Sequence, residues 1–197
     1  MLEETLLNTF NSQYDPKETA LIARVCNGDQ HALELLYNDY HPRLFRFIGR
    51  VTWNPEIIEE VINDVMYTVW EKAVTYNHQC RLSTWIFGIA YNKARQALRD
   101  SDRSHEDSLD DMNTDSLEFG TNDVGLKQLE MRDLLEDSFK MLSADQRTVV
   151  ELTYFEGLHY SEIALLMDCP ENTVKTRMHH ARKILASHLT NYEDASK

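Results

Sequence analysis

A run of basic and short polar side chains near the C-terminus is the stretch of the sequence best suited to bind another molecule. Between residues 173 and 188 there is no acidic residue, although the whole chain has a formal net charge of -13. Lys175, Arg177, Arg182 and Lys183 form a local basic strip there. Lysine and arginine bind phosphates, and short polar side chains near a helix start reach the edges of DNA bases. These residues therefore predict recognition of duplex DNA.

Two short helices joined by a tight turn would present this strip to DNA, as in a helix-turn-helix motif. The sequence predicts a first helix over 161–167, a turn at Asp168-Cys169-Pro170 and a second helix over 173–186. The apolar residues that would pack inward from the second helix recur at steps of four, three and four: Val174, Met178, Ala181 and Leu185.

The opposite face of the second helix is polar, since successive residues turn by about 100°. We expect the following residues to contact DNA: Asn172, Thr173, Lys175, Thr176, Arg177, His179, His180 and Lys183. A surface helix with ordinary charges is the alternative interpretation. DNA binding is favoured by three features together: the turn of small residues, the apolar residues that face inward and the strip in which every charged side chain is positive.

Many of the acidic residues of the chain lie in one segment, residues 101–127. This stretch has eight acidic residues against Arg103 and Lys127, and its apolar residues are few and aperiodic. Such a composition predicts a flexible, solvated linker. A negative net charge counts against a free-standing DNA-binding protein. The objection weakens because so much of the charge lies outside the candidate DNA-binding segment.

This linker separates two segments that are rich in helix-forming residues, so we expect an all-α protein made of two small helical domains. The predicted divisions are a tail over 1–14, a first domain over 15–100, the acidic linker over 101–127, a second domain over 128–190 and a tail over 191–197.

Capping and breaking residues indicate where helices start and end. Asp15, which precedes a proline, is expected to cap the first helix, and Ser83 or Thr84 the last helix of the first block. Pro42 is expected to kink or split a long helix. In the second block, Ser143 and the three residues after it have the form of a capping box.

The same sequence argues against several other classes of protein. Cys26, Cys80 and Cys169 are far apart, so we expect free thiols, no metal site and no cofactor. No HExxH, P-loop, GxSxG or paired CxxC motif is present, which argues against an enzyme. No apolar run approaches the ~20 residues of a membrane helix, and the N-terminus lacks a secretory core. We therefore expect a cytoplasmic protein without membrane insertion.

Three motifs, in order and with the expected separation, resemble the extracytoplasmic-function (ECF) sigma factors of bacterial RNA polymerase. EIALLMDCPENTVKTRMHHARKIL resembles their region 4. IEEVINDVMYTVWEKA resembles the signature of their region 2, and STWIFGIAYNKARQALR resembles the stretch that follows it. Each motif alone is moderate evidence, whereas the three in sequence are strong evidence.

The resemblance implies a division of labour. Region 2 would bind core RNA polymerase and open the -10 element, and region 4 would bind the -35 element and the polymerase flap. The residues that would bind polymerase are Glu60, Asn63, Asp64 and Trp70. Those that would capture an unstacked -10 base and line its pocket are Tyr76, Asn77, His78, Gln79, Arg81, Trp85 and Asn92. For Trp70 and Trp85, plain core packing is the alternative.

The sequence departs from the family pattern at several positions. Glu60 and Asn63 stand where Asp and Gln are usual, which keeps the chemistry but changes its reach. Gly88 stands where Arg is frequent, and His159 where a capping Ser or Thr is common, so that the cap is expected to be weaker or to shift to Ser161. Asp168 occupies a turn position often held by Gly. These changes affect promoter detail and leave the resemblance intact.

The resemblance also implies partners and leaves alternatives open. Core RNA polymerase and promoter DNA are the expected partners. An anti-sigma protein is a third, for which the exposed apolar edge of the helix over 57–70 would be suitable. The acidic linker either mimics RNA phosphates in the polymerase or is a plain tether. The alternative function is a stand-alone helix-turn-helix regulator, which would need a dimer surface and an effector pocket.

Overall fold

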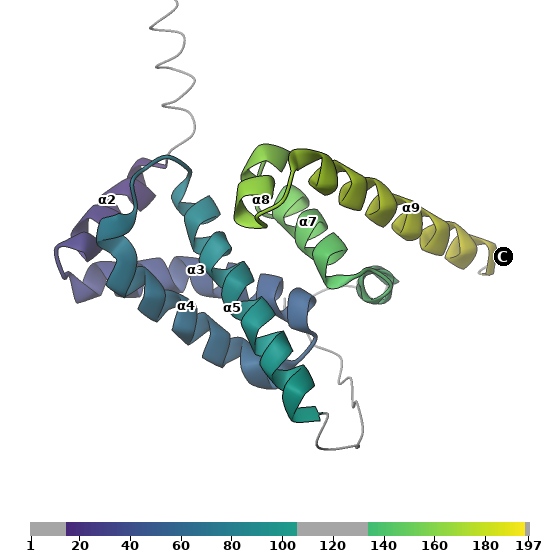
Figure 1. Cartoon of the computed structure of the whole chain (residues 1–197), viewed down its shortest axis with the longest axis horizontal. Coiled ribbons are helices and arrows are strands. Elements are labelled where there is room, and N and C mark those ends of the chain that lie inside the picture. The colour runs from purple at the N-terminus through teal and green to yellow at the C-terminus, as the bar shows by residue number, and fades with distance from the viewer. Residues whose placement is uncertain (1–14, 106–133, 196–197) are drawn as a thin grey trace, which may run out of the picture.

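The computed structural model describes residues 15–105 and 134–195, and within those ranges every regular element is a helix (Figure 1). The all-α prediction is therefore confirmed for this part of the chain. The predicted tail over 1–14 and most of the predicted acidic linker lie outside the described residues.

The first domain is a bundle of four long helices. These are α2 (Pro16–Cys26), α3 (Gln30–Thr52), α4 (Ile58–Lys72) and α5 (Leu82–His105), with short 3-10 helices at Pro55–Ile57 and Ala73–Thr75. The Asp15 carboxylate accepts a hydrogen bond from the Lys17 N–H at 2.8 Å, so the predicted cap of α2 is confirmed. Tyr40, Phe47 and Phe87 are fully buried and fill the core between α3 and α5.

Pro42, which was expected to kink or split a long helix, does not split α3. The helix is continuous from Gln30 to Thr52. Pro42 and Asn38, whose carbonyl loses its helical partner, are both exposed, so water can satisfy that carbonyl. On the inner face Tyr40 and Leu44 remain fully buried. Packing of the apolar face therefore outweighs the cost of about 3 kcal/mol for an interior proline.

The bounds of α5 also differ from the expectation. Ser83 and Thr84, the predicted caps, are buried inside the helix, which begins at Leu82. The Trp85 N–H already donates to the Arg81 carbonyl at 3.1 Å. At the other end α5 continues to His105, so residues 101–105 belong to the helix and not to the linker.

In the second domain the structure describes a helical segment over residues 134–140, followed by α7 (Ala144–Tyr154), α8 (Tyr160–Leu166) and α9 (Glu171–Ala195). The predicted capping box is confirmed: the Ser143 N–H donates to Gln146 Oε1 at 2.9 Å, and the Gln146 N–H donates to Ser143 Oγ at 3.3 Å. Helix α9 extends well past residue 186, where the sequence predicted its end.

The two domains are packed against each other. Helix α3 contacts α7 and α5 contacts α8, while α9 contacts α7 and α8 on their far side (Figure 1). The buried apolar residues of both domains form one continuous cluster. Gly88 of α5 lies at this boundary, where a Cβ would have Leu166 Cγ of α8 at 3.8 Å.

Replacement of Gly88 by alanine should stabilise the protein. The added methyl group would make only an ordinary van der Waals contact with Leu166. Since a glycine inside a helix costs about 1 kcal/mol relative to alanine, we expect Gly88→Ala to raise the free energy of unfolding by about 0.5–1 kcal/mol. Urea unfolding followed by circular dichroism would show a higher midpoint with an unchanged slope. A lower midpoint would show that the approach of α8 to α5 depends on the glycine.

Candidate nucleic-acid interface

Helices α8 and α9 form the predicted helix-turn-helix geometry. The turn between them has Asp168 in the left-handed conformation, with φ of 49°. The Cys169 N–H donates to the Ala164 carbonyl at 3.0 Å, and the Thr173 N–H donates to the Pro170 carbonyl at 2.8 Å. A short polar side chain such as that of aspartate tolerates this conformation better than most. The turn therefore forms without the glycine that is frequent there.

The face of α9 that the sequence predicted to be inward is buried. Val174, Met178 and Ala181 are at most 1% exposed, and Leu185 is partly buried against the same core. The outer face carries six of the predicted DNA-contacting residues, all exposed: Asn172, Lys175, Thr176, His179, His180 and Lys183. Thr173 is half-buried beside them. The structure thus brings polar, amide, imidazole and ammonium groups together on one solvent-facing surface, which we call the α9 outer face.

Contacts within α9 already orient part of this face. Lys175 Nζ lies 2.7 Å from a carboxylate oxygen of Glu171, one turn earlier. The Thr176 hydroxyl donates to the Asn172 carbonyl at 2.9 Å. Lys183 is exposed near the middle of the helix. The two lysines are about 12 Å apart along α9 and about 80° apart around it, a spacing that suits contacts with a DNA backbone.

Arg177 is engaged with the neighbouring helix. Its guanidinium forms an ion pair with the Asp145 carboxylate at the start of α7, and its Nη1 lies 3.5 Å from Cys169 Sγ. Arg182, which the sequence placed in the basic strip, donates from Nε to the Tyr154 hydroxyl at 3.1 Å. The two arginines thus tie α9 to α7. Nothing in the local sequence pattern reveals these ties, since their partners lie about thirty positions away along the chain.

An aromatic cluster lies on the loop between α4 and α5. The Tyr76 ring centroid is 4.5 Å from that of His78 and 5.3 Å from that of Trp85. Tyr76 is buried, and its hydroxyl donates to the Cys80 carbonyl at 2.7 Å, which fixes the loop. Trp85 is half-buried against the core. The structure therefore brings together three of the residues that the resemblance assigned to capture of an unstacked base.

The polar side chains of this loop point to solvent. Asn77, His78 and Gln79 are exposed, and the Asn77 amide oxygen accepts from the Gln79 N–H at 3.1 Å. His78 has a φ of 56°, a left-handed conformation that histidine adopts more readily than most residues. Asn92 is exposed on α5 and lies two turns beyond Trp85, so the two residues share one face of the helix.

Arg81 and Thr84 have partners in the second domain. Arg81 donates from Nη2 to a Glu162 carboxylate oxygen at 2.8 Å and to the Gly157 carbonyl at 2.9 Å. The Thr84 hydroxyl donates to Glu162 at 2.8 Å, and so does the His159 N–H, which keeps the cap of α8 at residue 159. Burial raises the pKa of the Glu162 carboxyl, but the hydrogen bonds from Arg81, His159 and Thr84 outweigh it and leave the pKa below its usual value.

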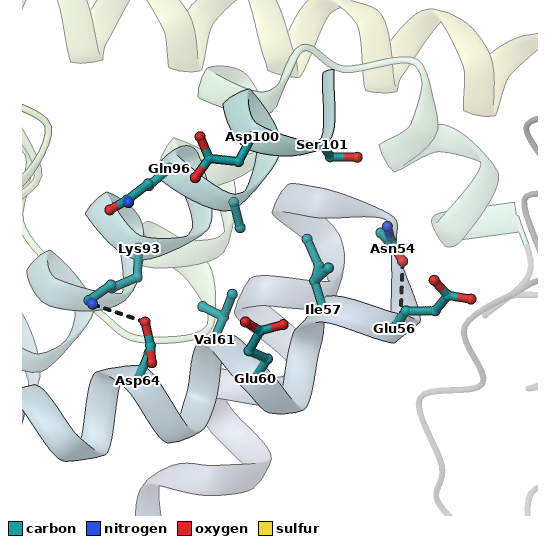
Figure 2. A pocket seen from close by; sticks show the side chains of 11 residues that line it. Asn54, Glu56, Ile57, Glu60, Val61, Asp64, Lys93, Gln96, Asp100 and Ser101 are labelled. Atoms are coloured by element: carbon teal, nitrogen blue, oxygen red, sulfur yellow. Dashed lines mark hydrogen bonds and ion pairs between the residues drawn. The ribbon is translucent and has the colours of Figure 1, made fainter. Parts of the chain in front are cut away.

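A groove of about 500 Å³ lies between the N-terminal half of α4 and α5 (Figure 2). Glu60 and Asp64 of the predicted polymerase-binding set line it, and Lys93 Nζ lies 3.0 Å from the Asp64 carboxylate across the groove. Two further carboxylates, Glu56 and Asp100, also line the groove. Glu56 lies in the 3-10 helix that leads into α4, and its sequence signal is its place beside Pro55 at the predicted start of that helix.

The other two residues of the predicted polymerase-binding set lie outside this groove. Asn63 is exposed on α4 next to Asp64, whereas Trp70 is half-buried and packs against the core of the first domain. Core packing, the alternative for Trp70, thus accounts for much of its ring surface. Among the described residues no cluster of histidine, cysteine and carboxylate side chains could hold a metal ion. None of the described helices is long and apolar enough to cross a membrane.

Comparison with known proteins matches both domains. Residues 36–104 match the family model for Sigma-70 region 2, and residues 132–185 match that for Sigma-70, region 4. The RNA polymerase sigma-H factor of Pseudomonas aeruginosa is 29% identical over 179 residues, which cover 86% of this chain and 92% of that protein. The ECF RNA polymerase sigma-E factor of Escherichia coli K12 is 26% identical over 179 residues, which cover 85% of this chain and 92% of that protein.

Two solved structures share the fold. One is that of CnrH in complex with the cytosolic domain of CnrY, with a TM-score of 0.64, 19% identity and coverage of 89% of this chain and 98% of that chain. The other is the sigma factor RpoE in complex with the anti-sigma factor NepR from Bartonella quintana. For that structure the TM-score is 0.63 and the identity 24%, with coverage of 82% of this chain and 96% of that chain.

Proposed function

The chain belongs to the sigma-70 family of RNA polymerase sigma factors, with relatives in the ECF group, and from this we propose how its two domains divide the work of starting transcription. As a sigma factor it directs core RNA polymerase to promoters and is a transcription initiation factor. We expect it to act in the cytoplasm, where the polymerase is. The observation that carries the detailed proposal is the α9 outer face, an exposed polar and basic surface on an otherwise acidic protein.

We propose that the second domain, over about 128–190, binds the -35 element with the α9 outer face. Asn172, Thr176 and the two histidines stand where a recognition helix presents side chains to base edges. Lys175 and Lys183 would contact phosphates on either side of the groove. The role of Arg177 would be to hold α9 on α7 through Asp145, with a phosphate contact from its remaining exposed surface. Two exposed lysines, one of them paired with Glu171, make a small electrostatic footprint, so affinity for DNA without polymerase should be low.

The first domain, over about 15–105, would capture the -10 element on the loop between α4 and α5. The cluster of Tyr76, His78 and Trp85 offers ring surface on which a base can stack. Asn77 and Gln79 are exposed beside it and can hydrogen-bond the edge of an unstacked base. The hydrogen bond from Tyr76 to Cys80 holds this loop in place before DNA arrives, which lowers the entropic cost of capture.

The acidic groove between α4 and α5 would receive core polymerase. Glu60 and Asp64 face into it with Glu56 and Asp100, so a partner surface that carries lysine or arginine would find a complementary charge there. Asn63 adds an exposed amide next to the groove. Trp70 would act indirectly, by packing α4 on the core and so holding the groove in shape.

We also propose that an anti-sigma protein controls this chain, because the sigma factor RpoE, which shares its fold, is bound by the anti-sigma factor NepR in the solved complex. The apolar edge expected on the helix over 57–70 is smaller than the sequence suggested, because Ile57 and Trp70 are half-buried. Tyr67 and Val74, which are 62% and 73% exposed, are the apolar residues that such a partner would cover there. The proposed roles of the acidic linker concern residues outside the described ranges.

In vitro transcription with core polymerase tests this function. With genomic fragments that include the region upstream of its own gene, we expect specific transcripts that start only when the protein is added. Co-purification with core polymerase would accompany them. The alternative, a stand-alone regulator, predicts the opposite pattern: tight binding to duplex DNA without polymerase, no polymerase binding and no new start sites. That pattern would overturn the proposed role of the first domain.

A further inference from the structure

Two adjacent histidines lie on the α9 outer face. His179 and His180 are both exposed, and their ring centroids are 5.9 Å apart. Successive residues of a helix are turned by about 100°, so the two imidazoles lie on opposite sides of a line that runs through Thr176 and Lys183 along the middle of this face. A duplex that receives α9 in its major groove would therefore have one imidazole on each side of the line of closest approach.

The surroundings of the two histidines on α9 are positively charged. Lys183 lies one helical turn beyond both of them, and Lys175 lies one turn before His179. Between residues 173 and 188 there is no acidic residue. A proton on either imidazole therefore meets like charge on α9 and no carboxylate that would balance it.

The helices α7 and α8 and the segment over 134–140 pack against α9, and their charged groups are held by other partners. These pairs are Asp145 with Arg177, Glu151 with Arg46 and Arg50, Glu162 with Arg81, Asp137 with Lys140, Tyr154 with Arg182, and Arg147 with the Val51 carbonyl. Glu136 is 8% exposed, and His188 contacts Ser138 at 3.0 Å. Asp168 and Glu171 lie at the start of α9, more than two turns from His179.

Protonation changes which groups an imidazole can recognise. A neutral imidazole has one hydrogen-bond donor and one acceptor, whereas the charged form has two donors and no acceptor. In the major groove guanine presents two acceptors, adenine an acceptor and a donor, and cytosine only a donor. The neutral form can thus pair with any of these bases, while the charged form suits guanine and the phosphates. One proton therefore alters both the affinity and the choice of base.

We propose that His179 and His180 read the -35 element in a proton-dependent manner, with each imidazole taking up a proton when α9 enters the groove. The proposal rests on the proposed function for the placement of α9 at the -35 element. The DNA phosphates surround a bound imidazole with negative charge and so favour its charged form. An imidazole ordinarily titrates near pH 6.5. Binding should therefore strengthen as the pH falls into this range, and the gain is lost as the pH rises above it.

The affinity of the assembled polymerase for a promoter measures this proton uptake. The full-length chain is combined with core polymerase, and binding to a promoter fragment found in the transcription experiment is followed at constant salt. We expect the dissociation constant of the wild type to fall at least about fivefold between about pH 7.8 and about pH 6.2. In His179→Gln/His180→Gln, whose amides form hydrogen bonds but do not titrate, the change should stay below about twofold.

The matched control removes two imidazoles from the first domain. His31 and His41 lie beside the carboxylates of Glu34 and Glu59 and far from α9 in the sequence. The variant His31→Gln/His41→Gln should respond to pH as the wild type does. The core polymerase is the same in every assembly, so its own dependence on pH cancels in the comparison.

Base preference gives a second readout that a merely structural role of the histidines would not change. Each base pair of the -35 element is replaced in turn, and the affinity for guanine is compared with that for the other bases at both pH values. At a position that an imidazole reads, we expect the preference for guanine to rise at least about threefold at the lower pH. In His179→Gln/His180→Gln the preference should be the same at both pH values.

The outcomes distinguish the proton-dependent reading from the proposed function. A pH response in His179→Gln/His180→Gln equal to that of the wild type would overturn the proposal, even if the protein directs transcription. A response that is the same for every base would overturn the reading of bases. If no promoter is found, the proposed function fails. Binding of the full-length chain to a fluorescent duplex of mixed sequence at low salt then decides the proton uptake by the same comparison of variants.

Discussion

Replacement of Lys175 and Lys183 by glutamate should abolish promoter-specific transcription. Both lysines are exposed on the α9 outer face, and each replacement turns a cation that we propose contacts phosphate into an anion that would repel the DNA backbone. We expect the double variant Lys175→Glu/Lys183→Glu to lose at least about a hundredfold in transcription from its own promoters, since each reversed contact costs ~1–3 kcal/mol. Run-off transcription with core polymerase at a fixed salt concentration measures the loss.

The control for this prediction changes the same charge elsewhere. Lys72 and Lys140 are exposed on other elements, so Lys72→Glu/Lys140→Glu alters the net charge equally while leaving α9 intact. Co-purification with core polymerase should be normal for both double variants, because the lysines lie outside the acidic groove. If Lys175→Glu/Lys183→Glu transcribes as well as the control does, α9 does not bind the -35 element.

Charge reversal in the acidic groove should have an equally large effect, on the earlier step in which the protein binds core polymerase. In Glu60→Lys/Asp64→Lys the two carboxylates that face the groove become cations, and the ion pair between Asp64 and Lys93 becomes a repulsion. A basic polymerase surface would then meet like charge at close range. We expect affinity for core polymerase to fall by at least about a hundredfold, since two reversed pairs cost ~3 kcal/mol or more together. Competition for core polymerase against a labelled wild-type chain measures it.

Two further measurements make this prediction specific. Glu34→Lys/Asp39→Lys reverses two exposed carboxylates on α3 and should bind polymerase as the wild type does. In Glu60→Lys/Asp64→Lys the unfolding midpoint should stay close to that of the wild type, because both side chains are exposed. Wild-type affinity in this variant would mean that polymerase docks on another surface of the first domain.

The helix-turn-helix was the part of the structure most accessible to sequence reasoning. Its signals are local: the inward spacing of Val174, Met178 and Ala181, and a turn residue, Asp168, that tolerates positive φ. The same holds for the capping box at Ser143. Where the sequence pattern misled, a local rule was outweighed by packing. Pro42 lies inside α3 because the loss of one hydrogen bond on the solvent-exposed side of the helix costs less free energy than an interruption of the buried apolar face.

The contacts between the domains had no signal in the sequence. Arg43 and Glu162 are charged residues of amphipathic helices, and Arg81 and Glu156 lie in the adjoining loops, so no local pattern singles them out. About 80 to 115 positions separate the partners. Only the folded arrangement shows that these side chains are buried together. The same is true of Arg177, whose engagement with Asp145 depends on how α9 packs on α7. The sequence thus predicted the surfaces of each domain but not how the domains cover one another.

The Glu162 carboxylate has two structural roles, and this limits which substitutions the protein can tolerate at residue 162. It caps α8 through the His159 N–H and also receives Arg81 and Thr84 from the first domain. A glutamine there would keep much of the cap but weaken the hold on Arg81. A change at Arg81 would leave the cap intact, so substitutions at residue 81 should destabilise the protein less than substitutions at residue 162.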